Sequence, residues 1–149
     1  MTEPIVIETV TSTELEPFQI APAAILSGAP QARNRILARS RDRNSCIMVW
    51  ECTAGRFNWQ YDVDETLVIV SGEVFVTNEK GEERRLSQGD VAFFPAGSSS
   101  TWRVTDHVKK VAFLRHHLPP LLGIGVIAWH RLLWVLGKRG RSSSTFGAV

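Results

Sequence analysis

Residues 55–72 read GRFNWQYDVDETLVIVSG and carry the clearest structural signal in the chain. Their first part alternates polar and aromatic residues, which places Phe57, Trp59 and Tyr61 on one face of a β-strand. We expect this aromatic face to turn inward. Asp62-Val63-Asp64 has turn chemistry, and a second apolar run follows it. The stretch therefore predicts two consecutive strands.

The same texture extends over residues 45–116, where short apolar runs alternate with turn signals. The predicted strands are residues 45–52, 56–61, 65–70, 73–78, 84–86, 91–94, 99–104 and 108–115. Gly81 and Gly89 fall where hairpin turns often need a positive φ, and Asp90 is placed to bond backbone amides of its own turn. Close, regular spacing of short strands predicts a β-sandwich or a small barrel.

The two ends of the chain differ from this β-rich region. Residues 1–44 contain four of the seven prolines and little periodicity, which predicts an extended arm with room for an early edge strand. After Pro119-Pro120 an apolar run continues to Gly137, and these are start and stop signals of a helix. The 149 residues thus predict one domain in three parts. These are the arm (1–44), a barrel core (45–117) and a C-terminal helix with a basic tail (118–149).

Two spaced motifs carry a family resemblance. Glu65 and Gly72 enclose six residues, and Gly89, Pro95 and Gly97 follow the pattern Gly, five residues, Pro, any residue, Gly. In this order they resemble the two motifs of the cupin superfamily, which implies an all-β, cupin-type (RmlC-like) jelly-roll β-barrel between the arm and the helix. Further features over residues 45–115 resemble the ureidoglycine aminohydrolase-like cupin group: Trp59 and Tyr61 before an Asp-Glu pair, Ser71-Gly72-Glu73-Val74, Phe94-Pro95-Ala96-Gly97 and Trp102.

The resemblance also implies where a metal would bind. Metal-binding cupins take two His and a Glu from the first motif and one His from the second. The histidine positions hold other residues here: Trp59 and Tyr61 in one register of the pattern, Asn58 and Gln60 in the other, and Ser100 in the second motif. Glu65 remains, and one carboxylate does not hold a divalent transition metal without N or S partners. We therefore predict no metal and no cofactor, although the ureidoglycine enzymes use manganese.

The same positions suggest a pocket for a small molecule. Trp59, Tyr61 and Trp102 would form apolar walls, with Ser100 nearby and Glu65 as the convergent charged group. Glu65 would then act as a general acid or base, or accept hydrogen bonds from an amine or ureido group. In the alternative, the aromatic residues fill the core and Glu65 pairs with a base such as Arg56 or Arg103. The sequence leaves both alternatives open.

Charge and cysteine placement bear on partners and compartment. Residues 1–20 hold four Glu and no base, whereas residues 33–43 hold five Arg and one Asp. No module of interleaved aromatic and basic residues accompanies these blocks, so we expect no nucleic-acid partner. Cys46 and Cys52 lie on one predicted strand, roughly 20 Å apart, too far for a disulfide. Together with the lack of a basic and apolar leader, this predicts a reducing, cytoplasmic location.

Two functional hypotheses follow, and they leave open whether a reaction is catalysed. The first is a cupin that binds a small polar, nitrogen-containing metabolite. The second is a non-enzymatic interaction or dimerisation module, whose C-terminal helix docks a partner or the surface of a membrane. His130 and Arg131 interrupt that apolar run, which argues against a full membrane span. A homodimer is expected from the family resemblance.

Overall fold

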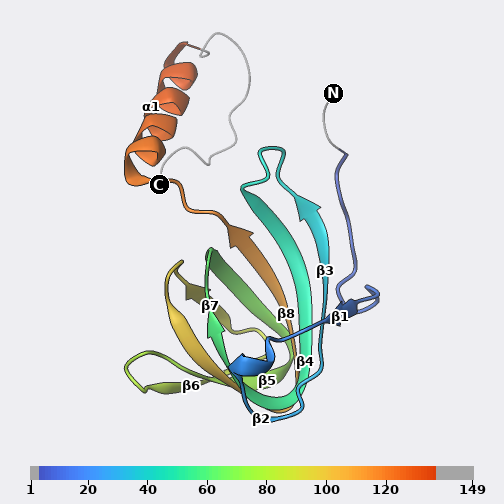
Figure 1. Ribbon diagram of the computed structural model, residues 1–149. Coiled ribbons are helices and arrows are strands. Elements are labelled where there is room, and N and C mark those ends of the chain that lie inside the picture. Colours follow the sequence, from blue (N-terminus) through green and yellow to red (C-terminus); the bar gives the residue numbers. More distant parts are fainter. Residues whose placement is uncertain (1–3, 137–149) are drawn as a thin grey trace. The chain divides into compact units, whose positions relative to one another are not determined.

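The computed structural model describes residues 4–136 and divides into two compact units, Met1–His117 and Leu118–Val149 (Figure 1). The strands are β1 (Glu16–Phe18), β2 (Ile25–Gly28), β3 (Ala32–Arg39), β4 (Ser45–Gln60), β5 (Asp64–Thr77), β6 (Glu83–Ser87), β7 (Val91–Phe94) and β8 (Ser99–Arg115). The helices are the 3₁₀ helix η1 (Pro22–Ala24) and the α-helix α1 (Pro120–Leu136). The predicted basic tail after residue 136 lies outside the described residues.

All strand pairs of the first unit are antiparallel and belong to one sheet of eight strands. Its main order is β1-β3-β4-β8-β5-β6, with β2 added to β4 and β7 added to β5. The long strands β4, β5 and β8 curve strongly, so that the sheet bends around its core (Figure 1). The all-β architecture predicted from the sequence is confirmed.

The prediction of eight short strands between residues 45 and 115 was wrong in one respect. Residues 45–60 form the single strand β4, and β5 and β8 likewise join pairs of predicted strands. Residues 53–55, which separate two of the predicted strands, are instead a shift of register between β4 and β8, and Ser71-Gly72 is a similar shift in β5. These residues become irregularities within a strand because β8 pairs with both halves of each neighbour and carries the hydrogen-bond ladder across them.

Residues 1–44 contain more regular structure than their sequence predicts. They supply β1, β2 and β3, and β3 pairs with β4 from Ala32↔Cys52 to Arg39↔Cys46. The sequence of β3, ARNRILAR, lacks the alternation that marks a half-buried strand. Residues 1–44 also pack closely against β4. A Cβ atom added at Gly55 of β4 would lie 2.7 Å from the ring of Pro30.

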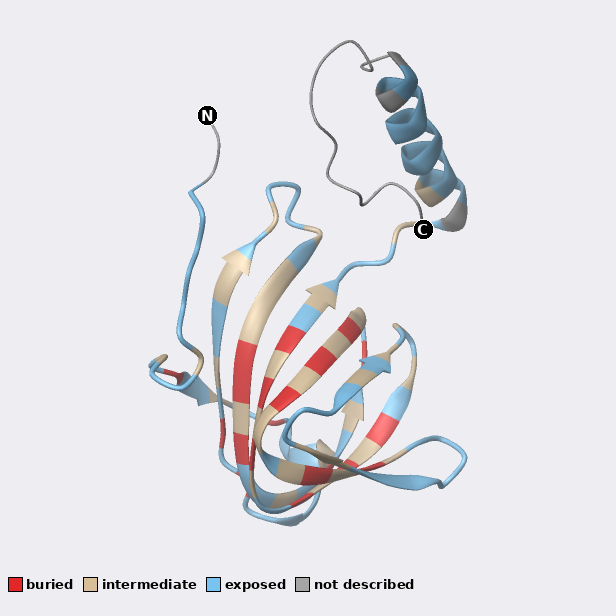
Figure 2. Cartoon of the chain, turned by 180° about the vertical axis from the view of Figure 1, so that it is seen from behind, coloured by how far each residue is buried: buried red, intermediate tan, exposed pale blue. Residues whose placement is uncertain are grey.

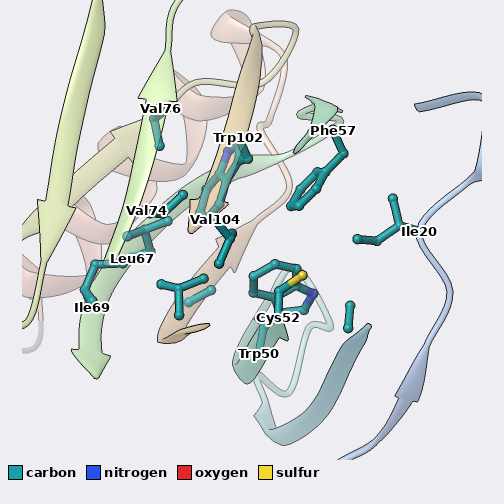
Figure 3. Close-up of a cluster of buried hydrophobic side chains, with 13 residues drawn as sticks. Ile20, Trp50, Cys52, Phe57, Leu67, Ile69, Val74, Val76, Trp102 and Val104 are labelled. Atoms are coloured by element: carbon teal, nitrogen blue, oxygen red, sulfur yellow. The ribbon is translucent and has the colours of Figure 1, made fainter. Parts of the chain in front are cut away.

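The core lies on the concave side of the bent sheet. Buried residues alternate with less buried ones along β4, β5 and β8 (Figure 2). Thirteen buried residues form one cluster (Figure 3): Ile20, Ala32, Trp50, Cys52, Phe57, Leu67, Ile69, Val74, Val76, Trp102, Val104, Val108 and Ala112. The expected orientation of residues 56–61 is confirmed, since Phe57 and Tyr61 are buried while Asn58 and Gln60 are exposed.

The predicted helix after Pro119 is present as α1, which has 17 residues. Apart from Gly123, every α1 residue whose burial the structure describes is exposed. Nine large apolar side chains are among them: Leu121, Leu122, Ile124, Val126, Ile127, Trp129, Leu132, Leu133 and Val135. Within residues 4–136, no helix combines the length and the hydrophobicity that a membrane crossing requires.

Candidate functional site

Glu65 lies in the interior of the sheet, where it forms an ion pair. Its side chain starts from β5 and accepts a hydrogen bond of 2.5 Å from Nζ of Lys110 on β8. The two residues are only 4% and 3% exposed. The alternative in which Glu65 pairs with a base is therefore confirmed, but the base is Lys110 and not Arg56 or Arg103. Arg103 instead forms a more exposed ion pair with Glu83.

Sequence reasoning missed Lys110, although the strand pattern contains its signal. Val108, Ala112 and Leu114 share a face of β8 with Lys110, and this face points into the core. The neighbouring Lys109 points to the opposite face, where its Nζ lies 3.8 Å from Oε2 of Glu51. A lysine in phase with buried apolar residues needs a charged partner, and the fold supplies it 45 positions away in the chain.

Two indole rings surround the Lys110 ammonium group. Its Nζ lies 4.5 Å from the ring centroid of Trp102 and 4.9 Å from that of Trp50. The negative faces of aromatic rings attract a cation, and this attraction is strongest where water is excluded. Glu65 and the two indoles therefore compensate the buried charge of Lys110 together.

Tyr61, Ser100 and Trp102 form a buried hydrogen-bonded triangle. The indole Nε1 of Trp102 donates to Tyr61 Oη at 2.9 Å and to Ser100 Oγ at 3.1 Å. The two hydroxyl oxygens lie 2.9 Å apart. The ring of Tyr61 stacks on Phe94 with 4.5 Å between centroids. Burial raises the pKa of the Tyr61 phenol well above its usual range, so the phenol keeps its proton at neutral pH.

Trp59 lies on a different side of the aromatic core. Its ring contacts Phe18 of β1 and Trp50, with centroid distances of 6.1 and 6.2 Å. Trp59 and Ser100 line a cleft of about 740 Å³, whereas Tyr61 and Trp102 lie behind Ser100 and line none of it. The structure therefore divides the predicted pocket into an outer part with Trp59 and Ser100 and an inner, enclosed part.

The cleft opens between the N-terminal segment and the neighbouring ends of β4, β5 and β8. Its lining residues are Phe18, Gln19, Ile20, Ala21, Ala24, Asn58, Trp59, Gln60, Thr77, Asn78, Glu79, Ser99, Ser100 and Thr101. Most of the polar members were not predicted. They lie on β4, β5 and β8, in the loop after β5 and just after β1, and only the fold brings them beside Trp59.

Hydrogen bonds fix two of these polar side chains. Glu79 Oε1 accepts hydrogen bonds from the backbone N of Ser99 at 2.8 Å and from its Oγ at 3.0 Å. Asn58 Oδ1 accepts one from Thr101 Oγ1 at 2.8 Å. The cleft therefore presents a held carboxylate and a held amide, whose remaining polar atoms are available to a ligand.

The residues at the metal positions do not fit a metal. Glu65 has an ammonium group as its partner, and the histidine positions hold indole, phenol, amide and hydroxyl groups. Over residues 4–136, no three His, Cys, Asp or Glu side chains come together as ligands. Cys52 adds no ligand, because burial raises the pKa of its thiol from 9.0 to about 12 against the opposing effect of Lys110.

The bent antiparallel sheet and its two glycine-bearing motifs define a cupin, which confirms the predicted superfamily and jelly-roll fold class. Residues 39–112 match the EutQ-like cupin domain family, so the chain carries a EutQ-like cupin domain within the cupin superfamily. No curated protein matches the sequence.

Solved structures agree with the cupin fold. A protein of unknown function from Pseudomonas syringae pv. tomato superposes with a TM-score of 0.64 and 24% identity, over 69% of this chain and 45% of that protein. The Cnp3 cupin domain of Schizosaccharomyces pombe gives 0.60 and 14%, over 78% and 77% of the two chains. The EutQ protein of Clostridium difficile gives 0.53 and 16%, over 66% and 81%. At these identities the likeness shows the fold alone, and the chain spans less than half of the Pseudomonas protein.

Proposed function

We propose that the protein binds a small polar molecule with amide or ureido groups in the cleft beside Trp59. The observation that carries this proposal is the hydrogen-bond state of Ser100. Its Oγ accepts the indole N–H of Trp102 and lies 2.9 Å from the Tyr61 hydroxyl oxygen, and either hydroxyl can donate in this second contact. Among the described residues, Ser100 is the acceptor within reach of the Tyr61 proton. When Tyr61 donates, both lone pairs of Ser100 are engaged, and its own proton is left to donate to a ligand carbonyl in the cleft.

Glu79 accepts hydrogen bonds, so it requires a donor group on the ligand, whereas Ser100 requires an acceptor. Its Oε1 is occupied by Ser99, which leaves Oε2 as an acceptor for an N–H group. The Asn58 amide, whose oxygen accepts from Thr101, has its NH₂ group left as a second donor. Carbonyl acceptors and N–H donors in one small planar group are the features of an amide or urea, and the Trp59 ring offers such a group a flat apolar surface.

This ligand class agrees with the resemblance to the ureidoglycine aminohydrolase-like cupins. Binding without turnover suits the site better than hydrolysis, because Glu65 is enclosed with Lys110 and lines none of the cleft. We propose a reducing, cytoplasmic setting for this function, in keeping with two cysteines that are free thiols.

Calorimetric titration with three families of probes tests the proposal: N-carbamoyl amino acids, simple carboxamides, and amines of the same size. We expect saturable binding of the first two families and weaker binding of the amines. Trp59→Ala and Ser100→Ala should each weaken that binding about five- to thirtyfold, since each loss removes roughly 1–2 kcal/mol. Ser27→Ala, on β2 and outside the cleft, is the matched control. Binding that survives Trp59→Ala unchanged would contradict the proposal.

A second candidate function rests on α1, which has nine exposed large apolar residues. We propose that α1 lies on an anionic membrane surface. The helix is about 26 Å long, shorter than the roughly 30 Å of a bilayer's hydrocarbon core. Its only ionisable side chains are His130 and Arg131, and the sequence has no acidic residue after Asp106. Apolar burial and attraction to anionic lipid then act together.

Flotation with vesicles of phosphatidylcholine alone, or mixed with phosphatidylserine, tests the membrane proposal. We expect binding that strengthens with phosphatidylserine and is lost in the Ile124→Asp/Ile127→Asp variant. Arg131→Glu should reduce the preference for phosphatidylserine. Leu26→Asp, which replaces an exposed apolar residue of β2, is the control. Failure to float with either vesicle, or self-association through α1 in their absence, would contradict it.

The predicted homodimer has a candidate surface on the convex side of the sheet. Register places Phe93, Thr66, Phe113 and Ile47 in one row across β7, β5, β8 and β4, with Phe93 61% and Phe113 45% exposed. The row has no ionisable side chain, so we propose that it packs against the same row of a second copy. Analytical ultracentrifugation should then show a dimer that Phe93→Asp dissociates, and a monomeric parent protein would contradict this.

A further inference from the structure

Glu65 is the glutamate that the first cupin motif contributes to a metal centre in metal-binding relatives, and here it has an uncommon set of neighbours. The Lys110 ammonium donates to its Oε1, and both residues are at least 96% buried. Trp50 and Trp102 face the ammonium from within 5 Å. A cation is thus present at the motif glutamate, and it belongs to the chain itself.

We propose that the Lys110 ammonium takes the place of the metal ion in this barrel, as an internal cation that closes the interior to divalent metals. A buried carboxylate without a positive partner is strongly unfavourable, so some cation must accompany Glu65. Lysine fulfils this requirement at any metal concentration. The proposal concerns the interior and does not depend on what binds in the outer cleft.

The surrounding side chains discriminate between the two kinds of cation. A divalent transition metal needs several N, S or O donors at short range, and indole rings provide none. The faces of indole rings do stabilise an organic ammonium. A divalent ion beside Glu65 would also meet the positive charge of Lys110 at close range, and displacing Lys110 would leave its ammonium buried without a carboxylate.

Removal of the internal cation provides the test. Lys110→Ala leaves Glu65 unpaired beside a space about the size of a propylammonium ion, and we expect a melting temperature roughly 10 °C below that of the parent protein. Added n-propylammonium should restore part of the loss by entering this space, as small molecules enter other engineered cavities. Neither n-propanol nor Mn²⁺ or Zn²⁺ should do so. The parent protein, incubated with Mn²⁺ or Zn²⁺ and desalted, should contain less than one tenth of an equivalent of metal.

Two further variants keep the test decisive if Lys110→Ala does not fold. Glu65→Gln/Lys110→Met removes both charges and should be more stable than either single replacement, because no unpaired charge is then buried. The matched control is the exposed ion pair of Arg85 with Glu73, for which Arg85→Met should shift the melting temperature by no more than about 2 °C. Stoichiometric metal in the parent protein, stabilisation of Lys110→Ala by a divalent ion, or a Lys110→Ala variant as stable as the parent would overturn the proposal.

Discussion

Gly72 lies so close to His107 that a Cβ atom at residue 72 would stand 1.9 Å from the His107 carbonyl oxygen. Gly72 also has a φ angle of +71°, which is unfavourable for any residue with a Cβ atom. Gly72 lies where the register between β5 and β8 shifts. The close approach of its backbone to His107 lets β5 pass β8 at this point. The last glycine of the first cupin motif is therefore a packing requirement of this sheet.

Replacing Gly72 with Ala should destabilise the protein severely. The new methyl group must displace backbone rather than a mobile side chain, and it also meets the unfavourable φ angle. We expect a loss of at least about 3 kcal/mol in the free energy of unfolding, measured by urea denaturation with tryptophan fluorescence.

Gly81 provides the matched control for that variant. Its φ angle of +82° is similar, but no atom lies within 4 Å of an added Cβ. Gly81→Ala should therefore cost only about 1 kcal/mol, the effect of the backbone conformation alone. Equal losses at residues 72 and 81 would show that the contact with His107 contributes nothing.

The two cysteines should differ in reactivity. Cys52 is 1% exposed, and the raised pKa of its thiol keeps it protonated, whereas Cys46 is partly exposed. Treatment of the native protein with N-ethylmaleimide should give one adduct by mass spectrometry, at Cys46, and two adducts after unfolding in urea. Rapid double labelling of the folded protein would contradict this expectation.

Stability should decrease in alkaline solution. Burial raises the pKa of Cys52 from 9.0 to about 12, so the unfolded chain releases this proton at a lower pH than the folded chain does. The contribution is fully present below about pH 9 and is lost progressively toward pH 12, at no more than about 1.4 kcal/mol per pH unit. Tyr61, whose pKa is also raised by burial, adds to the loss above pH 10.

Urea titrations at pH 8, 9 and 10 measure this slope. Cys52→Ala should have a lower free energy of unfolding at pH 8 but a shallower decrease with pH, because the group that links protonation to folding is absent. A parent protein whose stability is constant from pH 8 to pH 10 would rule out the buried thiol as the cause.

The alternation of residues 56–61 was sufficient to orient a strand, and the positions of Glu65, Gly72 and Gly89 were sufficient for the superfamily. The lengths of the strands could not be predicted from such local patterns. Gly55 and Gly72 have the composition of turns, and their conversion into irregularities of long strands depends on β8, which pairs with residues far away in the chain.

The site was predicted only in part, for a related reason. Sequence reasoning placed Trp59, Tyr61, Ser100 and Trp102 together, and the hydrogen-bonded triangle joins three of them. The sequence left open whether Glu65 faces a ligand or pairs with a base, because its partner Lys110 was not recognised. Strand periodicity could have shown that Lys110 points inward, but which carboxylate it meets depends on the register and bending of the whole sheet.

The buried triangle itself permits a last prediction. Tyr61→Phe removes the hydroxyl but leaves the Trp102 N–H bonded to Ser100, so we expect a loss of about 1–2 kcal/mol. Ser100→Ala similarly leaves the bond from Trp102 to Tyr61. Only the double variant leaves the Trp102 N–H buried without a partner, whereas each single variant already loses the hydrogen bond between Tyr61 and Ser100. We therefore expect the losses to be non-additive, by about 1 kcal/mol. Urea denaturation of the four proteins gives this coupling energy. Strictly additive losses would mean that the three groups do not act as a network, and Ser100 would then lose its assignment as a committed donor toward the cleft.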